Sequence, residues 1–416
     1  MAREHTAING IVRSLIEKHG KITFQTFMET ALFAPDAGYY ASPMRRSLAR
    51  DYYTAPNTHP IFGSLIAVQL EQIWEQMDRV TPFHIVEVGA GSGSLGRDIL
   101  SYSSKLSSGF QNAIEYVSID IQPRTQDSKK LHTIRALGLP VRNIVGCILS
   151  NELIDSFPVH RFAIHDGIIK EIYVTLDTNY ELTEVLDSPS TSLIGERIAS
   201  LDIRLPEGFQ GEVCLDLETW TRDISKSLEK GFILTFDYGQ AAHQMYSDAH
   251  NSGTLRTFYR HTQTHNPYFM PGEQDITSDV DFTSLISLGE CYNLEYVGII
   301  PQREFLYNLG FQKHLNTLTH MGLNQRDLDS NRMSMLDLVK LGQMGDFKVL
   351  AQHKGIPTSP NLAGFLDQDS PKESLDGSTI FPDTPLLTPR HVPLMDAKYP
   401  HLSWDWEKLW PFGHSC

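Results

Sequence analysis

The chain has 416 residues, of which 41% are hydrophobic and 20% are charged, and its formal net charge is −15 at pH 7. Its length fits one large domain with insertions, or two domains, and its composition is that of an ordinary globular protein. The acidic balance argues against nucleic acid as a partner, because phosphate binding needs a basic surface; it suits cationic ligands or basic peptides, although solubility alone would account for it.

Residues 1–82 predict a helical N-terminal region. Apolar residues at helical spacing occur in two stripes between residues 8 and 33, and Ile61 to Met77 is a further amphipathic helix. Between them, APDAGYYASP and DYYTAPNTHP carry two aromatic pairs close to glycine, proline and threonine. This composition indicates a shaped loop and not a linker.

From Phe83 the pattern becomes strand, turn and helix in alternation, which predicts an α/β fold with a mostly parallel sheet and helices on both faces. The predicted strands are FHIVEVG, AIEYVSID, VGCILSNE and GFILTFDYG. The predicted helices between them are SLGRDILSYSSKL, QPRTQDSKKLHTIRALG and EVCLDLETWTRDISKSLEKG. We place this core at residues 83–355.

Two segments depart from the alternation. Residues 156–211 contain β-like runs and a Pro/Ser turn region, which predicts an inserted arm. Residues 356–416 hold nine of the 22 prolines and three of the five tryptophans. Proline interrupts regular elements whereas aromatic residues favour burial, so we expect a tail that packs on the core.

The turn after the first core strand, EVGAGSGSLG, fits two cofactor classes. Glycines permit positive φ and close approach of a ligand, and the next helix offers free N–H groups. A dinucleotide turn, G-x-G-x-x-G, fails from Gly89 because Ser94 occupies the last position; from Gly91 it fits, but begins two residues late. A tight turn without a ligand is the third possibility.

The other register, E-x-G-x-G-x-G, is satisfied at once by Glu87, Gly89, Gly91 and Gly93. It resembles the nucleotide-binding loop of class I S-adenosylmethionine methyltransferases. Asp120 ends the second strand, 27 residues after Gly93, where a carboxylate can accept both ribose hydroxyls. That acid supports adenosine binding in either class, and the methyltransferase register fits better.

Acidic side chains follow two further core strands. SNELIDSFP places Asn151, Glu152 and Asp155 after the third strand, and TFDYG places Asp237 at the end of the fourth. Ligands in open α/β sheets bind beyond the carboxyl ends of the strands, so we expect Glu152, Asp155 and Asp237 to form a catalytic mouth for a cationic methyl acceptor. The alternative is that the first two acids only cap a short helical turn.

Several stretches together resemble the MidA-type family of S-adenosylmethionine-dependent methyltransferases over about residues 8–355. They are, in chain order, FMETALFAPDAGYY, DYYTAPNTHPIFG, IVEVGAGSGSL, LSNELIDSFPVHRF, DYG, GTLRTFYRH and PGEQDITSDVDF. The resemblance implies a class I methyltransferase fold with a seven-stranded sheet, an added substrate-binding region and S-adenosylmethionine as cofactor. Mitochondrial members of that family are associated with arginine methylation.

Family positions transfer residue by residue. The cofactor-binding positions fall on Tyr53, Thr54, Glu87, Gly89, Gly91, Gly93, Asp120 and Asn151. The resemblance implies that the aromatic loop containing Tyr53 and Thr54 closes over the cofactor. Here that loop reads TAPNTHP, where the family often has Thr-Ser-Pro-Glu, so the contact made by that acid does not transfer.

The sequence thus predicts a methyltransferase acting on a protein arginine side chain. Alternatives are a small-molecule methyltransferase, an NAD(P)-linked oxidoreductase and a non-catalytic assembly or binding factor. No metal site is predicted, because His261 and His265, although four residues apart, lack a third ligand. The sequence does not predict the oligomeric state.

The location is predicted from the cysteines and the N-terminal segment. The four cysteines are far apart and form no CxxC pair, which fits a reducing compartment. The first 20 residues lack an apolar signal core and a clear transit pattern, and no run of about 18 apolar residues predicts a membrane span. We therefore expect a cytoplasmic protein.

Overall fold

The core of the protein is a seven-stranded sheet with the order β16-β17-β10-β5-β2-β3-β4. In this computed structural model the described residues are 7–42, 54–124, 127–259, 262–264, 266–357, 360–366 and 384–391. The strands are β2 (Phe83–Val88), β3 (Ile114–Asp120), β4 (Leu131–Arg135), β5 (Ile144–Asn151), β10 (Leu228–Asp237), β16 (Glu295–Pro301) and β17 (Lys348–Lys354).

Strands β4 through β10 pair in parallel, and only β17 runs against both of its neighbours. This order, with one reversed strand next to the edge, is the class I methyltransferase arrangement. The predicted α/β fold with a mostly parallel seven-stranded sheet is therefore confirmed. All carboxyl ends of the parallel strands meet at one edge of the sheet, where the turns after β2, β3 and β5 come together.

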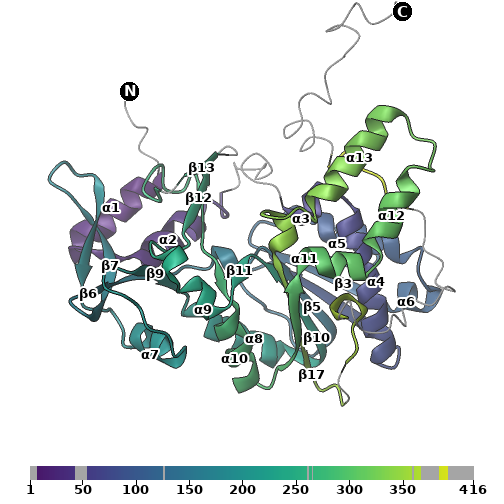
Figure 1. Ribbon diagram of the computed structural model, residues 1–416, viewed down its shortest axis with the longest axis horizontal. Coiled ribbons are helices and arrows are strands. Elements are labelled where there is room, and N and C mark those ends of the chain that lie inside the picture. The colour runs from purple at the N-terminus through teal and green to yellow at the C-terminus, as the bar shows by residue number, and fades with distance from the viewer. Residues whose placement is uncertain are drawn as a thin grey trace, which may run out of the picture.

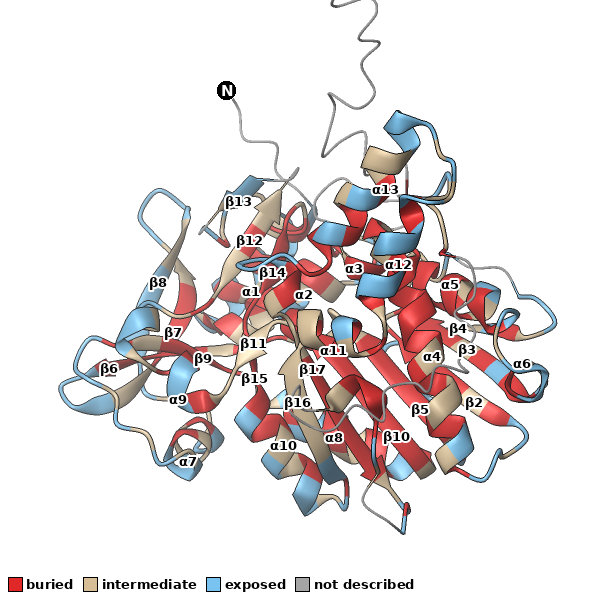
Figure 2. Cartoon of the chain, turned by 45° about the vertical axis from the view of Figure 1, so that its right-hand side comes forward, coloured by how far each residue is buried: buried red, intermediate tan, exposed pale blue. Residues whose placement is uncertain are grey.

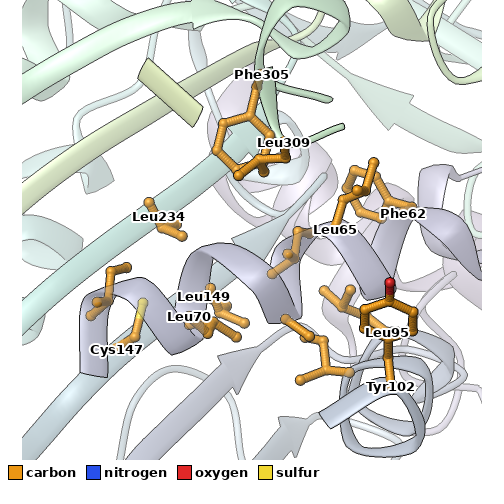
Figure 3. Close-up of a cluster of buried hydrophobic side chains, with 14 of the residues drawn as sticks. Phe62, Leu65, Leu70, Leu95, Tyr102, Cys147, Leu149, Leu234, Phe305 and Leu309 are labelled. Carbon is orange, nitrogen blue, oxygen red and sulfur yellow. The ribbon is translucent and has the colours of Figure 1, made fainter. Parts of the chain in front are cut away.

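Both faces of the sheet are buried because its strands are apolar at consecutive positions and not at alternate ones. In β5, Cys147 and Leu149 face one core cluster while Ile148 faces the other, and β10 divides in the same way. Figure 2 shows the central strands buried along their length. Figure 3 shows Cys147, Leu149 and Leu234 pointing toward helix α4.

The helices lie on both sides of the sheet (Figure 1). One face is covered by helices that share the first cluster, namely α4 (Ile61–Gln76), α5 (Ser94–Ser103), α6 (Ser108–Ala113), α11 (Gln302–Asn308), α12 (Phe311–Leu318) and α13 (Gln325–Asp337). The other is covered by α8 (Asp216–Ser227) and α10 (Phe282–Cys291). Among the residues that the structure describes, no helix is long and apolar enough to cross a membrane.

The inserted arm is an antiparallel sheet at the left of Figure 1. Its strands are β1 (Ile22–Thr23), β6 (His160–His165), β7 (Ile168–Leu176), β8 (Leu182–Asp187) and β9 (Gln210–Val213), joined by helix α7 (Leu193–Ser200). Strand β1 comes from the N-terminal region, and α1 (Ala7–His19) and α2 (Phe24–Phe33) pack beside it. The N-terminal helices and the arm thus share one core.

Small elements join the arm to the core. A three-stranded sheet consists of β12 (Arg256–Tyr259), β13 (Thr262–Thr264) and β14 (Asp275–Thr277), and a two-stranded one of β11 (Gly239–Gln240) and β15 (Val280–Asp281). The short helices are α3 (Ala55–Thr58) and α9 (Ala242–Met245). Asp275, the first residue of β14, lies beside the N-terminal region, where it accepts a hydrogen bond from Tyr40.

One predicted element is wrong. QPRTQDSKKLHTIRALG was expected to be a helix, whereas residues 131–135 form strand β4, paired in parallel with β3 from Tyr116 to Asp120. Pairing along the exposed edge of β3 satisfies a full ladder of backbone hydrogen bonds, which outweighs the weak helical propensity of this charged segment.

Beyond residue 357, two parts of the predicted tail fall within the described residues. Residues 360–366 include a turn of 3₁₀ helix, Ala363–Phe365, where Phe365 packs against Phe305 with ring centroids 5.6 Å apart. In the second part, residues 384–391, Leu386 contacts the core cluster. Both parts lie against the core, as does Ile356 at the start of the tail, and the tail beyond residues 356–357, 360–366 and 384–391 is outside the described residues.

Gly146 in β5 and Gly231 in β10 are paired residues that allow the middle of the sheet to pack closely. Gly146 in β5 has φ of 148°, and a Cβ there would lie 2.0 Å from the backbone oxygen of His84 in β2. We expect Gly146→Ala to lower the free energy of unfolding by about 2–4 kcal/mol, because backbone atoms must separate. Urea denaturation measures this.

The matched control is Gly195→Ala in helix α7, where an added Cβ meets no atom within 4 Å. That change should raise stability by about 0.5–1 kcal/mol, since alanine is the better helix former. Equal stability of both variants would contradict the close pairing at Gly146.

Candidate active site

A cavity of about 320 Å³ lies at the carboxyl edge of the sheet, within the size range of ligand pockets. Its walls come from the turns after β2, β3 and β5, the start of helix α5, helix α3 and the C-terminal segment 384–391. Of the predicted site residues it brings together Thr54, Glu87, Gly89, Gly91, Asp120, Asn151 and Glu152. Asp155, Asp237 and Gly93 do not line it.

The glycine turn adopts a conformation that other residues rarely take. Gly89, Gly91 and Gly93 have φ of 76°, 52° and 67°, all in the left-handed region. The N–H of Gly89 donates to the carbonyl of Ile119 at 2.9 Å, which ties the turn to β3, and Gly93 precedes helix α5. A Cβ on Gly91 would meet no protein atom within 4 Å, so this glycine faces open cavity space.

Asp120, the last residue of β3, is fixed by two backbone donors. Its Oδ2 accepts from the N–H of Gly91 at 2.8 Å, and its Oδ1 accepts from the N–H of Gln122 at 2.7 Å. Burial raises the pKa of Asp120, and these two hydrogen bonds act against that rise. Each carboxylate oxygen keeps a free lone pair, so the side chain can still accept hydroxyl donors from the cavity.

Glu87 lines the cavity but is almost fully buried, at 3% exposure. Its Oε2 accepts from the hydroxyl of Tyr116 at 2.7 Å. Burial raises the pKa of Glu87 to about 8, against the lowering effect of that hydrogen bond. Glu87 is therefore mostly protonated at neutral pH, and it can donate a hydrogen bond as well as accept one.

The chain leaves β5 through a strained residue. Glu152 has φ of 47°, which is uncommon for a residue with a Cβ, and its N–H donates to the carbonyl of Phe236 at 2.8 Å. Its Oε1 accepts from the N–H of Ala55 at 3.1 Å and from the side-chain amide of Asn151 at 3.1 Å. Burial, and then the charge of Asp155, raises the pKa of Glu152 to about 8.

Asp237 and Asp155 lie behind Glu152. The Oδ2 of Asp237 accepts from the N–H groups of Leu153, Ile154 and Asp155, at 3.2, 2.9 and 3.4 Å. Asp237 is fully buried, and burial raises its pKa well above the ordinary value. Asp237 thus caps the 3₁₀ turn Ile154–Ser156. This capping role was the alternative expected for Glu152 and Asp155.

The side chain of Asp155 is 5% exposed, and burial raises its pKa to about 6. Its backbone carbonyl accepts from the N–H of Ser278 at 2.9 Å. Since neither Asp155 nor Asp237 lines the cavity, their position fits action through Glu152 better than contact with a reactant. Their predicted catalytic roles stay predictions.

Of the predicted aromatic loop, the structure describes the part from Thr54 onward, and this part reaches the cavity. Thr54 lines the cavity, and its Oγ1 accepts from the Asn57 side chain at 2.9 Å. Asn57 in turn accepts from the hydroxyl of Ser92 in the glycine turn at 2.9 Å. Tyr53, like Tyr52, is outside the described residues, as are His261 and His265.

Sequence reasoning missed several lining residues, among them Tyr40, Asn57, Gln122, Arg97 and Arg390. Tyr40 lies in the APDAGYYASP stretch, whose composition did indicate a shaped loop, and its hydroxyl donates to Asp275 at 2.6 Å. Arg390 carried no signal, because its contact with the cavity depends on how the tail returns to the core.

The cavity fits the cofactor that the family resemblance implies. Gly91 leaves open the space that a Cβ would fill, and Asp120 offers carboxylate oxygens beside it, as a ribose diol requires. The start of α5 and the side chains of Arg97 and Arg390 supply positive charge for a carboxylate. Acids and cations thus occupy one pocket, which suits a zwitterionic nucleoside derivative.

Fold and cavity together define a class I methyltransferase, and comparisons with known proteins agree. Residues 65–300, more than half of the chain, match the family described as "Putative S-adenosyl-L-methionine-dependent methyltransferase". The chain belongs to this family, which confirms the resemblance to MidA-type enzymes and the predicted cofactor, S-adenosyl-L-methionine.

Curated relatives and a solved structure extend the match. The chain is 27% identical to the protein arginine methyltransferase NDUFAF7 of Rattus norvegicus mitochondria, over 87% of this chain and 88% of the relative. It is 26% identical to the mitochondrial homologue in Drosophila melanogaster, over 88% and 87%. A Burkholderia thailandensis protein crystallised with S-adenosyl-homocysteine is 25% identical, with a TM-score of 0.74 over 86% of this chain and 94% of that one.

The predicted location is contradicted by these comparisons. A cytoplasmic protein was expected from the cysteines and the N-terminal segment, whereas the curated relatives are mitochondrial proteins. A mitochondrial matrix is also a reducing compartment, so scattered cysteines do not separate the two locations.

Filling the space at Gly91 should abolish cofactor binding. We expect Gly91→Val to weaken binding of S-adenosylhomocysteine by more than about 100-fold, because its side chain would occupy the cavity. Titration calorimetry measures this. Gly20→Val is the matched control, since Gly20 also has positive φ and open space around it but lies in the N-terminal region. Equal affinity in both variants would contradict the site.

The raised pKa of Glu87 predicts how stability depends on pH. In the unfolded chain this carboxyl ionises near its ordinary pKa of 4.5, whereas in the folded protein it holds its proton up to about 8. Its contribution to stability is therefore present below pH 4.5 and is lost as the pH rises through 8. Glu87→Gln should raise the free energy of unfolding at pH 9 by about 1–4 kcal/mol relative to the native chain, and should change it little at pH 5.

Urea denaturation at both pH values tests this, with Glu115→Gln on the exposed side of β3 as control. A Glu87→Gln effect that is the same at pH 5 and pH 9 would contradict the buried, protonated state.

Proposed function

We propose that the chain transfers a methyl group from S-adenosyl-L-methionine to a nitrogen of an arginine side chain in a protein. The observation that carries this proposal is the carboxyl group of Glu152, which lines the cavity at the exit from β5 and is half-buried there. The names of the curated relatives, protein arginine methyltransferases, support the same acceptor.

The electrostatics of the mouth favour a cation. Glu152 lies near Asp155 and Asp275, whose charges both raise its pKa, so a cation bound beside Glu152 favours its ionised form. An arriving guanidinium stabilises the ionised form of Glu152 and releases its proton. The carboxylate then accepts charge-assisted hydrogen bonds from the planar guanidinium, which fix its orientation.

When bound, the cofactor supplies a methyl group on a positively charged sulfur. In the transfer the carbon–sulfur bond breaks, sulfur keeps the electron pair, a carbon–nitrogen bond forms, and one proton must leave the nitrogen. Glu152 serves as the acceptor of that proton, with the fixed geometry that the Ala55 N–H and the Asn151 amide give it. Asp237 acts as a positioning residue, since it holds the turn that follows Glu152.

The substrate reaches this mouth past residues of the added region. Tyr40, in the turn that follows α2, lines the cavity and is hydrogen-bonded to Asp275 on β14, so the N-terminal region and the small sheet meet beside the cofactor site. This arrangement supports a peptide or protein acceptor that contacts both the arm and the core.

The proposal is tested with S-adenosyl-L-methionine labelled in the methyl group, incubated with purified protein and a cell extract. Mass spectrometry should find the label on arginine side chains of a protein. We expect Glu152→Gln to lower the turnover rate by about 100-fold or more, while the affinity for S-adenosylhomocysteine changes by less than about threefold.

Glu218→Gln on the exposed side of helix α8 is the control and should keep the native rate. Label on small molecules alone would contradict a protein acceptor, and the absence of any label with bound cofactor would favour a non-catalytic binding factor. A native turnover rate in Glu152→Gln would remove the catalytic role of that residue.

A further inference from the structure

We propose that Arg390, in the C-terminal segment 384–391, completes the cofactor site by binding the carboxylate of the methionine part of S-adenosyl-L-methionine. This inference rests on the cofactor of the proposed function and extends it, because it gives a segment beyond the last strand of the sheet a direct part in binding. Arg390 lines the same cavity as Gly91, Ser92 and Arg97 of the glycine turn and helix α5.

The segment is anchored at its start. Thr384 is 3% exposed, and its hydroxyl is 3.1 Å from the Nδ1 of His314 in helix α12. The N–H of Leu387 donates to the Oδ1 of Asn331 in helix α13 at 2.8 Å. Together with the contact of Leu386 with the core cluster, these bonds fix the path of the chain toward the cavity.

The segment is anchored again at its end, directly after Arg390. His391 is 1% exposed, and its Nε2 lies 3.5 Å from the Oδ2 of Asp98 in helix α5. Its Nδ1 is 2.9 Å from the hydroxyl of Thr388. With buried anchors on both sides, Arg390 is held at the cavity wall while its own side chain remains exposed to the ligand space.

Two cations face each other in this corner of the cavity. Arg97 and Arg390 both line this cavity, and burial, and then the charge of Arg390, lowers the pKa of Arg97. Arg97 donates through Nη2 to the carbonyl of Ser92 at 2.5 Å, and its buried Nε has no hydrogen-bond partner. Within the described part of the chain, no ion pair holds the side chain of Arg390.

Two acids act on Arg97, first Asp98 and then Glu87. Asp98 does not line the cavity, and its Oδ2 lies 3.5 Å from the Nε2 of His391. Glu87 lines the cavity, but its pKa of about 8 leaves it mostly protonated at neutral pH. The N-terminal end of helix α5 adds positive potential at the same place, so the lining of this corner favours an anion, and the carboxylate is the anionic group of the cofactor.

Ligand pairs that differ in the amino-acid part test the inference. S-adenosylhomocysteine carries the carboxylate, and 5′-methylthioadenosine keeps the adenosine and sulfur but lacks it. In titration calorimetry with the full chain, we expect Arg390→Gln to weaken binding of S-adenosylhomocysteine about 10-fold or more and to change binding of 5′-methylthioadenosine by less than about twofold. Arg390→Lys should keep part of the affinity, since it retains the charge.

The control is Arg222→Gln. This change removes an arginine from helix α8, which does not line the cavity, and should leave both affinities unchanged. Equal losses for both ligands, or tighter binding of S-adenosylhomocysteine in Arg390→Gln, would overturn the inference. If the native chain binds neither ligand, the proposed cofactor site is wrong. If the native chain binds both ligands and Arg390→Gln changes neither affinity, only the role of Arg390 is wrong.

Discussion

The carboxyl group of Asp237 holds the turn on which the cavity depends. It accepts from three successive backbone N–H groups after β5, for which the described residues offer no other acceptor. Because an unpaired buried N–H costs about 1–3 kcal/mol, the turn after β5 is stable only with this acceptor in place. The left-handed backbone at Glu152, and with it the direction of the Glu152 side chain, follows from that turn.

Burial determines the charge of the acids in the cavity. Glu87 and Glu152 line it with pKa values of about 8, so they contribute little negative charge at neutral pH. Arg97 and Arg390 line the same cavity, and Arg97 lies close enough to Glu87 for their charges to interact. A ligand that brings its own positive charge ionises the acids next to it, which makes the binding of cofactor and acceptor mutually favourable through the same carboxyl groups.

Sequence reasoning predicted the parts of the site that lie within one strand and its following turn. Gly89, Gly91, Asp120 and Glu152 each sit where a strand ends, and the fold brings strand ends together by a general rule of parallel sheets. The predictions were wrong or incomplete where contacts between residues distant in the sequence determine the local structure. Residues 131–135 became a strand because the edge of β3 was free, and Arg390 reached the cavity because the buried residues beside it found partners on α5, α12 and α13.

The reversed strand β17 gives the core an order of assembly. It lies between β10 and β16 and pairs with both through backbone hydrogen bonds. In chain order, however, it is the last strand of this sheet. Until residue 354 is available, β10 has an unpaired edge on the side away from β5, and β16 has no strand in this sheet to pair with. A nascent or truncated chain that ends before β17 therefore leaves the edge of β10 unpaired, and the sheet that carries the cavity closes only after Lys348–Lys354 has been made.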